Sequence, residues 1–207
     1  MIQHRFAMGP PCTLRRFAEP VDLARWEELH EEARRLEMLV LHACSLDTLT
    51  GLPTVLPMLT ELNLSSNNLT GFFGSGGGSV GVLGGSRVWT GMANLKKLDL
   101  SSNRMRGSVF LPNNISGGLG GGFFPALELL LVPYNAISSL EGISAVAPKL
   151  QGLDARSNRL RSAVEALQQL RALPVLQRLD LRGECVCPRG RVCVLLVLLI
   201  VIIAAAT

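Results

Sequence analysis

The chain has 207 residues, of which 48% are hydrophobic and 17% charged. These proportions suit one folded domain with a sizeable core, and they exclude a chain that is disordered throughout. The net charge of +4 is mild and no concentrated basic run accompanies it, so nucleic-acid binding is not expected. Aromatic residues make up only 5% of the chain, which favours a core built from aliphatic side chains.

The first 35 residues indicate a flexible start followed by a helix. Residues 1–19 contain charges and prolines and lack the apolar run of about 7–15 residues that a signal peptide needs. Residues 20–35 place apolar side chains at helical spacing, with Leu23, Trp26 and Leu29 on one face. We predict a flexible N-terminus over residues 1–19 and a helical N-terminal cap over residues 20–35, with a partner-binding helix as the alternative.

One pattern recurs from residue 36 to residue 186. Its form is L-x-x-L-x-L-x-x-N-x-L, as in LTELNLSSNNL from Leu59 and LKKLDLSSNRM from Leu95. The core of each copy alternates with period two, so it predicts a short strand whose leucines share one face. Parallel strands stacked side by side would join these leucines into one ladder. The copies start at Leu36, Leu59, Leu95, Leu127, Leu150 and Leu176.

The position after each strand is polar in most copies. Four copies have asparagine there, the first has cysteine, and the last has Glu184. An asparagine side chain at a turn can bond backbone groups that would otherwise be buried without partners. We predict a structural ladder of Cys44, Asn67, Asn103, Asn135 and Asn158.

The segments between the copies differ in composition. Residues 71–92 and 107–122 contain fifteen of the 21 glycines, so we predict Gly-rich inserts that order poorly. Between the last two copies, Val164, Leu167, Leu170 and Leu173 share a helical face, which predicts a helix. These return segments would cover the side of the leucine ladder that the strands leave open.

Residues 187–207 form an apolar C-terminal tail. Residues 192–206 are uncharged and would span about 22 Å as a helix, against a hydrocarbon core of roughly 30 Å. Three interpretations stay open: a C-terminal membrane anchor that uses residues 192–206, a buried cap element, or an error at the end of the gene model.

The cysteines give no sign of a disulfide framework or a metal site. Their number is odd, and Cys185, Cys187 and Cys193 lack both C-x-x-C spacing and a nearby histidine. We therefore expect no metal ion and no cofactor. Without a signal peptide, the repeats are expected to face a reducing cytoplasm. The alternative location is a membrane, with the chain attached by its C-terminus and facing the cytoplasm.

The phrases YNAISSLEGI and LPVLQRLDLRG, at residues 134–143 and 173–183, resemble the cytosolic short-repeat class of leucine-rich-repeat proteins. That class includes the regulatory subunit of protein phosphatase 1, the axonemal dynein light chain and the acidic nuclear phosphoproteins. The resemblance covers roughly residues 36–184 apart from the inserts. Together with the repeats, it implies an α/β solenoid: a right-handed superhelix with a parallel sheet on its concave face.

The variable positions beside the strand leucines would face the concave side. Their charges balance, which argues against a phosphate-binding face. Leu129, Leu131, Pro133 and Tyr134 would form an apolar centre with charge around it, the usual pattern of a protein interface. We predict a partner-binding site that consists of Val40, His42, Glu61, Asn63, Lys97, Asp99, Leu129, Leu131, Tyr134, Asp154, Arg156, Arg178, Asp180 and Arg182.

The sequence does not predict an enzyme. Its three histidines are far apart in the sequence, and no nucleophile elbow, metal pair or phosphate loop is present. Asp154 and Asp180 could lie on adjacent strands, but neighbouring arginines would keep both ionised, which does not suit an acid–base pair.

The function that follows is a non-enzymatic scaffold or regulatory subunit. It would bind an unidentified protein partner on the concave face, with no small-molecule substrate and no nucleic acid. The alternatives are a tail-anchored membrane adaptor that uses the same face, and an axonemal or cytoskeletal light-chain-like subunit.

Overall fold

The computed structural model describes residues 13–17, 33–49, 52, 56–71, 91–110 and 124–183. Most of its elements are short strands, as the alternating L-x-L cores predict. The bounds are β1 (Thr13–Phe17), β2 (Met38–His42), β3 (Glu61–Asn63), β4 (Lys97–Asp99), β5 (Arg106–Ser108), β6 (Leu129–Leu131), β7 (Ala136–Ser139), α3 (Ile143–Val146), β8 (Gly152–Asp154), α4 (Ala163–Arg171) and β9 (Arg178–Asp180).

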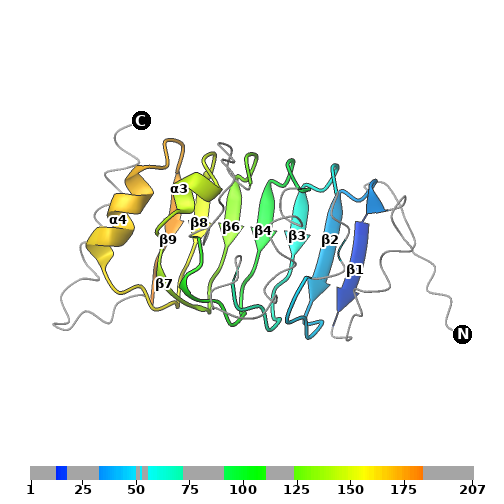
Figure 1. The fold of residues 1–207 in the computed structure, drawn as a ribbon, viewed down its shortest axis with the longest axis horizontal. Helices are drawn as coiled ribbons and strands as arrows, with labels where there is room; N and C mark the ends of the chain where they lie inside the picture. The colour runs from blue at the N-terminus through cyan, green and yellow to red at the C-terminus, as the bar shows by residue number, and fades with distance from the viewer. Residues whose placement is uncertain are drawn as a thin grey trace, which may run out of the picture.

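Seven parallel strands form one sheet in the order β1-β2-β3-β4-β6-β8-β9. Figure 1 shows them side by side along the long axis of the molecule. Equivalent residues of successive repeats are paired, which confirms the predicted solenoid with a parallel sheet on one face. The row at the centre of the strands consists of Leu14, Leu39, Leu62, Leu98, Leu130, Leu153 and Leu179.

The core is almost wholly aliphatic. It consists mainly of this leucine row and of a second row that lies two residues further along each repeat. Leu62 and Leu98 are fully buried, and their neighbour Leu130 is 1% exposed. Each buried leucine contributes about 1.5–3 kcal/mol relative to an exposed one. The second buried row consists of Leu41, Leu64, Leu100, Val132, Ala155 and Leu181. The core is therefore a continuous ladder that no single repeat could form alone.

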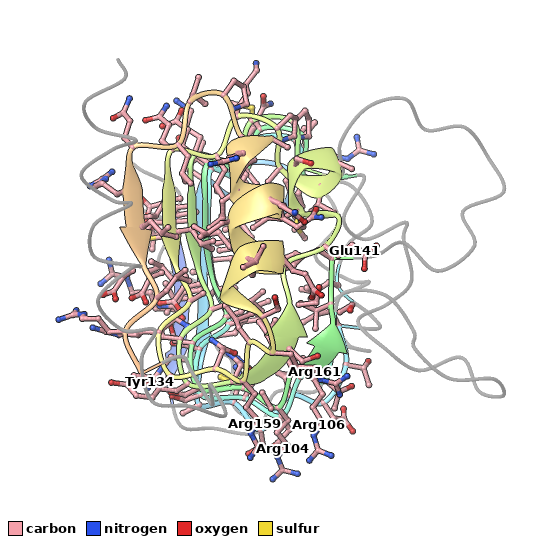
Figure 2. All side chains as sticks on the ribbon, turned by 90° about the vertical axis from the view of Figure 1, so that its left-hand side faces the viewer. Arg104, Arg106, Tyr134, Glu141, Arg159 and Arg161 are labelled. Atoms are coloured by element: carbon pink, nitrogen blue, oxygen red, sulfur yellow. The ribbon has the colours of Figure 1, made fainter. Side chains whose placement is uncertain are left out.

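The opposite layer holds α3, α4 and a second, two-stranded sheet of β5 and β7. Figure 2 looks along the row of strands and shows this layer across the core from the seven-stranded sheet. The chain returns through α3, where Ile143 and Val146 are buried. The large side chains of Phe110 and Phe124 are buried in the same core.

The structure confirms the helix predicted between the last two repeats, but the face that this helix buries differs from the predicted one. Ser162 caps α4 by accepting a hydrogen bond from the backbone N–H of Glu165 at 3.2 Å. Ala166 and Leu170 are buried, whereas Val164 is 66% exposed. The predicted face was wrong for Val164 because steps of three residues drift by about 60° each around a helix. Buried positions four residues apart follow the helix more closely.

The N-terminal prediction was wrong for residues 13–17, which form β1 rather than a flexible segment. This strand pairs in parallel with β2, and Leu14 extends the leucine row beyond Leu39. Only one buried leucine and no following asparagine mark this strand, so it lacks the repeat pattern. The predicted helical cap lies outside the described residues except for residues 33–35, where Ala33 is buried.

The second Gly-rich insert begins later than predicted. Gly107 lies within β5, and Val109 and Phe110 are buried in the core, so residues 107–110 belong to the solenoid. Of the first insert, residues 71, 91 and 92 are described, and Met92 is fully buried in the core. Residues 72–90 and 111–122 of the inserts and the predicted tail, residues 187–207, lie outside the described residues. Across the part that the structure describes, no helix has the length and hydropathy needed to cross a membrane.

Candidate partner-binding face

Three rows of side chains cross the outer surface of the seven-stranded sheet, and we call this surface the sheet face. The first row consists of Thr13, Met38, Glu61, Lys97, Leu129, Gly152 and Arg178. The second row consists of Arg15, Val40, Asn63, Asp99, Leu131, Asp154 and Asp180. The third row lies two residues beyond the second along each coil. It consists of His42, Ser65, Ser101, Pro133, Arg156 and Arg182.

The three rows bring together all of the predicted partner-binding residues except Tyr134. Val40 is 9% exposed, so it offers a partner little contact area. Thr13 and Arg15 were not predicted on this face, because β1 carries no repeat pattern. The alternation around Leu14 was the only signal, and it spans too few residues to distinguish a strand from a loop.

An asparagine ladder along one edge holds the strands in register. The side chain of Asn103 donates to the backbone oxygens of Leu64 and Leu100, both at 3.0 Å, and accepts from the backbone N–H of Leu69 at 3.0 Å. Asn67, Asn135 and Asn158 make the corresponding bonds in their own repeats. Each asparagine therefore ties one coil to its neighbour at the point where the strand ends.

Cys44 occupies the asparagine position of the first repeat. Its thiol is buried and donates to the backbone oxygen of His42 at 3.4 Å. The imidazole of His42 lies on the sheet face, where Nδ1 is 2.8 Å from the hydroxyl of Ser65. The thiol thus has a structural position beneath the face rather than a reactive position on it.

The second row contains polar side chains that close the turns after the strands. Asp99 accepts from the backbone N–H of Ser101 at 2.9 Å, and Asn63 makes the equivalent bond to Ser65 at 2.9 Å. Asp154 and Asp180 do the same for the residues two positions further on. Such Asx turns fix the local backbone. These polar side chains therefore stabilise the sheet face and also form part of it.

Opposite charges are paired along the sheet face. Lys97 Nζ lies 3.4 Å from Glu61 Oε2, and Arg182 Nη2 lies 2.6 Å from Asp180 Oδ2. The hydrogen bond from Arg182 holds the pKa of Asp180 below its ordinary value, against the opposing effect of partial burial. This direction agrees with the prediction that neighbouring arginines keep the Asp180 carboxylate ionised.

The middle of the sheet face is apolar. Leu129 and Leu131 project from β6, which lies between β4 and β8, and both side chains are half-buried. Leu129 leans over Gly152 on the next strand: a Cβ placed on Gly152 would come within 2.8 Å of Leu129 Cδ1. The missing side chain at Gly152 therefore lets one leucine cover two strands.

Replacing Gly152 with valine is expected to move Leu129 while leaving the fold intact. The contact is with the flexible end of Leu129, and valine suits a strand, so the free energy of unfolding should change by no more than about 1 kcal/mol. Methyl NMR should show new shifts for Leu129 and loss of its contact with the backbone of residue 152. Unchanged Leu129 methyl signals would contradict the contact between these residues.

Tyr134 lies at the edge of the sheet face, not in its rows. It directly precedes the ladder residue Asn135 and has a left-handed backbone with φ of 57°. The equivalent residues Ser66 and Ser102 share this conformation, which is costly for a bulky side chain. Figure 2 shows Tyr134 at the lower rim. Its ring is 55% exposed, and the guanidinium of Arg156 lies 5.6 Å from the ring centroid.

The stacked parallel strands, the leucine rows and the asparagine ladder define a leucine-rich-repeat solenoid. Two family models agree with this assignment: Leucine Rich repeat matches residues 55–71, and Leucine Rich Repeat matches residues 94–120. These segments contain the copies that start at Leu59 and Leu95. A search of curated proteins found no match.

Solved structures of two internalins from Listeria monocytogenes are similar to the chain. Internalin inlF has 17% identity and a TM-score of 0.46, with 83% of this chain and 48% of that one covered. Internalin C2 has 21% identity and a TM-score of 0.45, with 86% and 76% covered. The chain thus spans about half the length of the first internalin.

Proposed function

We propose that the chain is a non-enzymatic scaffold or regulatory subunit that binds a protein partner through the sheet face. The observation that carries the proposal is the apolar centre of Leu129 and Leu131, half-exposed on an outer surface and bordered by paired charges. An apolar centre with a polar rim is the usual arrangement of a protein interface. Leucine-rich repeats are typically interaction modules rather than enzymes, which agrees with this role.

The arrangement favours a partner segment with an apolar anchor. Leu129 and Leu131 supply a contact on the central strand, and the exposed ring of Tyr134 supplies a second contact at the rim. Aromatic residues of this kind often contribute most of the energy of an interface. Tyr134 adopts a strained conformation at a position that serine occupies in three other repeats, so folding alone does not require a tyrosine there.

Alanine at both Leu131 and Tyr134 is expected to reduce partner binding at least tenfold without loss of stability. Tyr134 is exposed and Leu131 is only half-buried, so removing both side chains takes little packing from the core. The wild-type chain and the variant should be used as baits in the native source, followed by titration with the captured partner. Thermal unfolding measures whether the fold is kept.

The matched control is alanine at Val164 and Val175, two exposed apolar residues outside the sheet face. It should leave binding unchanged. If the variant at Leu131 and Tyr134 binds the partner as tightly as wild type does, the sheet face is not the recognition surface.

The cytoplasmic location and the short-repeat class are also part of this proposal. Their support is the resemblance of residues 134–143 and 173–183 to that class. Fractionation of cells that express the full chain tests the location, and recovery with membranes would favour the tail-anchored adaptor.

A further inference from the structure

Four arginines gather at the edge of the solenoid where the strands end. Arg104 and Arg106 follow the ladder asparagine of their repeat by one and three residues, and Arg159 and Arg161 follow theirs in the same way. All four side chains are exposed. Figure 2 shows them together along the lower edge, with Glu141 higher on the same layer. The repeat thus concentrates charges that are far apart in the sequence.

The coil between the two arginine pairs carries small side chains at the same positions. Ala136 and Ser138 stand where the neighbouring coils have arginine, and β7 pairs with β5 on one side. On the other side, the backbone N–H groups of Arg159 and Arg161 donate to the backbone oxygens of β7. Coils in such a stack are about 4.8 Å apart, so the arginine pairs are separated by about twice that distance.

A hollow of about 410 Å³ lies at this place. The described residues that line it are Arg106, Gly107, Ala136, Ser138, Arg159 and Arg161. Three of these residues are small, and the other three carry guanidinium groups. This hollow is distinct from the sheet face, which lies on the other side of the core.

The positive charge of the hollow has no counterion among the described residues. The ion pairs of this part of the chain involve other residues, namely Lys96 with Glu128, Lys97 with Glu61, Arg156 with Asp154 and Arg182 with Asp180. On the sheet face, by contrast, Arg156 and Arg182 each have a carboxylate beside them. Within the described part of the chain, no carboxylate therefore competes with an external anion for the four edge arginines.

We propose that this hollow, which we call the arginine hollow, binds a phosphorylated side chain of a protein partner. A phosphate group carries nearly two negative charges and three acceptor oxygens, so it can engage several guanidinium groups at once. Arginine provides a planar fork of donors that fits phosphate oxygens in pairs. Among the described lining residues the cations are all arginines and none is lysine, which favours this paired geometry over a diffuse positive patch.

Two other anionic ligands fit the arginine hollow less well. Single-stranded nucleic acid needs aromatic platforms for its bases, and none of the described residues that line the hollow is aromatic. A lipid surface needs apolar side chains beside the charges, and the exposed large apolar residues of the described part lie elsewhere. The exposed ones are Met58, Tyr134, Val164 and Val175.

Fluorescence polarisation of the full chain with short labelled peptides tests the proposal. The probes are three peptides with one phosphoserine, phosphothreonine or phosphotyrosine in a Gly-Ala context, each with its unphosphorylated twin. We expect at least one phosphopeptide to bind tenfold or more tightly than its twin. Raising the salt concentration should weaken this binding, because the contact is between exposed charges.

Two double variants distinguish binding in the arginine hollow from a general effect of positive charge on phosphopeptide affinity. Arg159→Gln with Arg161→Gln should lower phosphopeptide affinity at least tenfold. The control, Lys149→Gln with Arg171→Gln, removes the same charge from exposed positions and should change affinity less than twofold. Ser138→Gln adds a longer side chain to the lining of the hollow without changing its charge, and it should lower affinity severalfold. Circular dichroism checks that each variant is folded.

Three results would overturn the proposal. They are equal affinity for all phosphopeptides and their twins, an equal loss in the control variant, and tighter binding of a single-stranded RNA dodecamer or phosphatidylserine vesicles than of any phosphopeptide. The variant with alanine at Leu131 and Tyr134 should keep its phosphopeptide affinity. Failure of the arginine hollow and failure of the sheet face are therefore distinguishable.

Discussion

Replacing Asn103 with alanine is expected to lower the free energy of unfolding by roughly 3–5 kcal/mol. The side chain is 9% exposed and bonds to backbone groups of two neighbouring coils. Its removal leaves the backbone oxygens of Leu64 and Leu100 and the N–H of Leu69 without this partner in a buried place. Each such loss costs about 1–3 kcal/mol. Urea denaturation measures the difference.

Asn94→Ala provides the matched control for this prediction. Asn94 makes one side-chain bond, to the backbone oxygen of Pro57 at 2.8 Å, and this bond is exposed. Its loss should cost no more than about 1 kcal/mol. If both alanine variants lose the same stability, the buried ladder does not hold the coils together.

Replacing Leu98 with alanine is expected to lower the free energy of unfolding by about 2–5 kcal/mol. Leu98 is fully buried in the centre of the leucine row, between Leu62 and Leu130. The cavity would interrupt the ladder in the middle of the solenoid, where each coil is stabilised mainly by its neighbours. The urea transition should therefore also become less cooperative, with different midpoints for probes on the two sides of β4.

Lys97→Ala on the same strand serves as the control. Its ion pair with Glu61 at 3.4 Å is largely exposed, so its contribution is about 0–1 kcal/mol. A Leu98→Ala variant that is as stable as Lys97→Ala would show that the leucine row does not carry the core.

The repeated coils could be predicted from the sequence because each copy contains the residues that specify its own strand and turn. The alternating leucines specify a strand with one buried face, and the asparagine three residues beyond the last leucine of that core specifies a turn. The same register places Glu61, Lys97 and Asp180 on one surface without any knowledge of distances. Local pattern and global fold agree at these positions, which is why the pattern was sufficient.

Other features depend on contacts that no local pattern encodes. The strand at residues 13–17 is defined by its pairing with β2 and not by a repeat of its own. The tilt of Leu129 depends on the absence of a side chain at Gly152, on a different strand. Tyr134 was expected on the face, but its left-handed backbone places it at the rim.

The arginine hollow shows the same limit for charge. Arg106 and Arg159 lie far apart in the sequence, in two separate pairs of arginines. Their shared offset from the ladder asparagines would have indicated that they lie on one edge. Their proximity also requires the pairing of β5 with β7, and this second sheet is not part of the leucine pattern.

Photo-crosslinking from single positions tests the central claim most directly. Benzoylphenylalanine placed at position 131 reports on the sheet face, and the same residue placed at position 145 reports on the exposed side of α3 across the core. With the captured partner, we predict strong crosslinking from position 131 and none from position 145. Crosslinking from position 145 alone would contradict recognition by the sheet face.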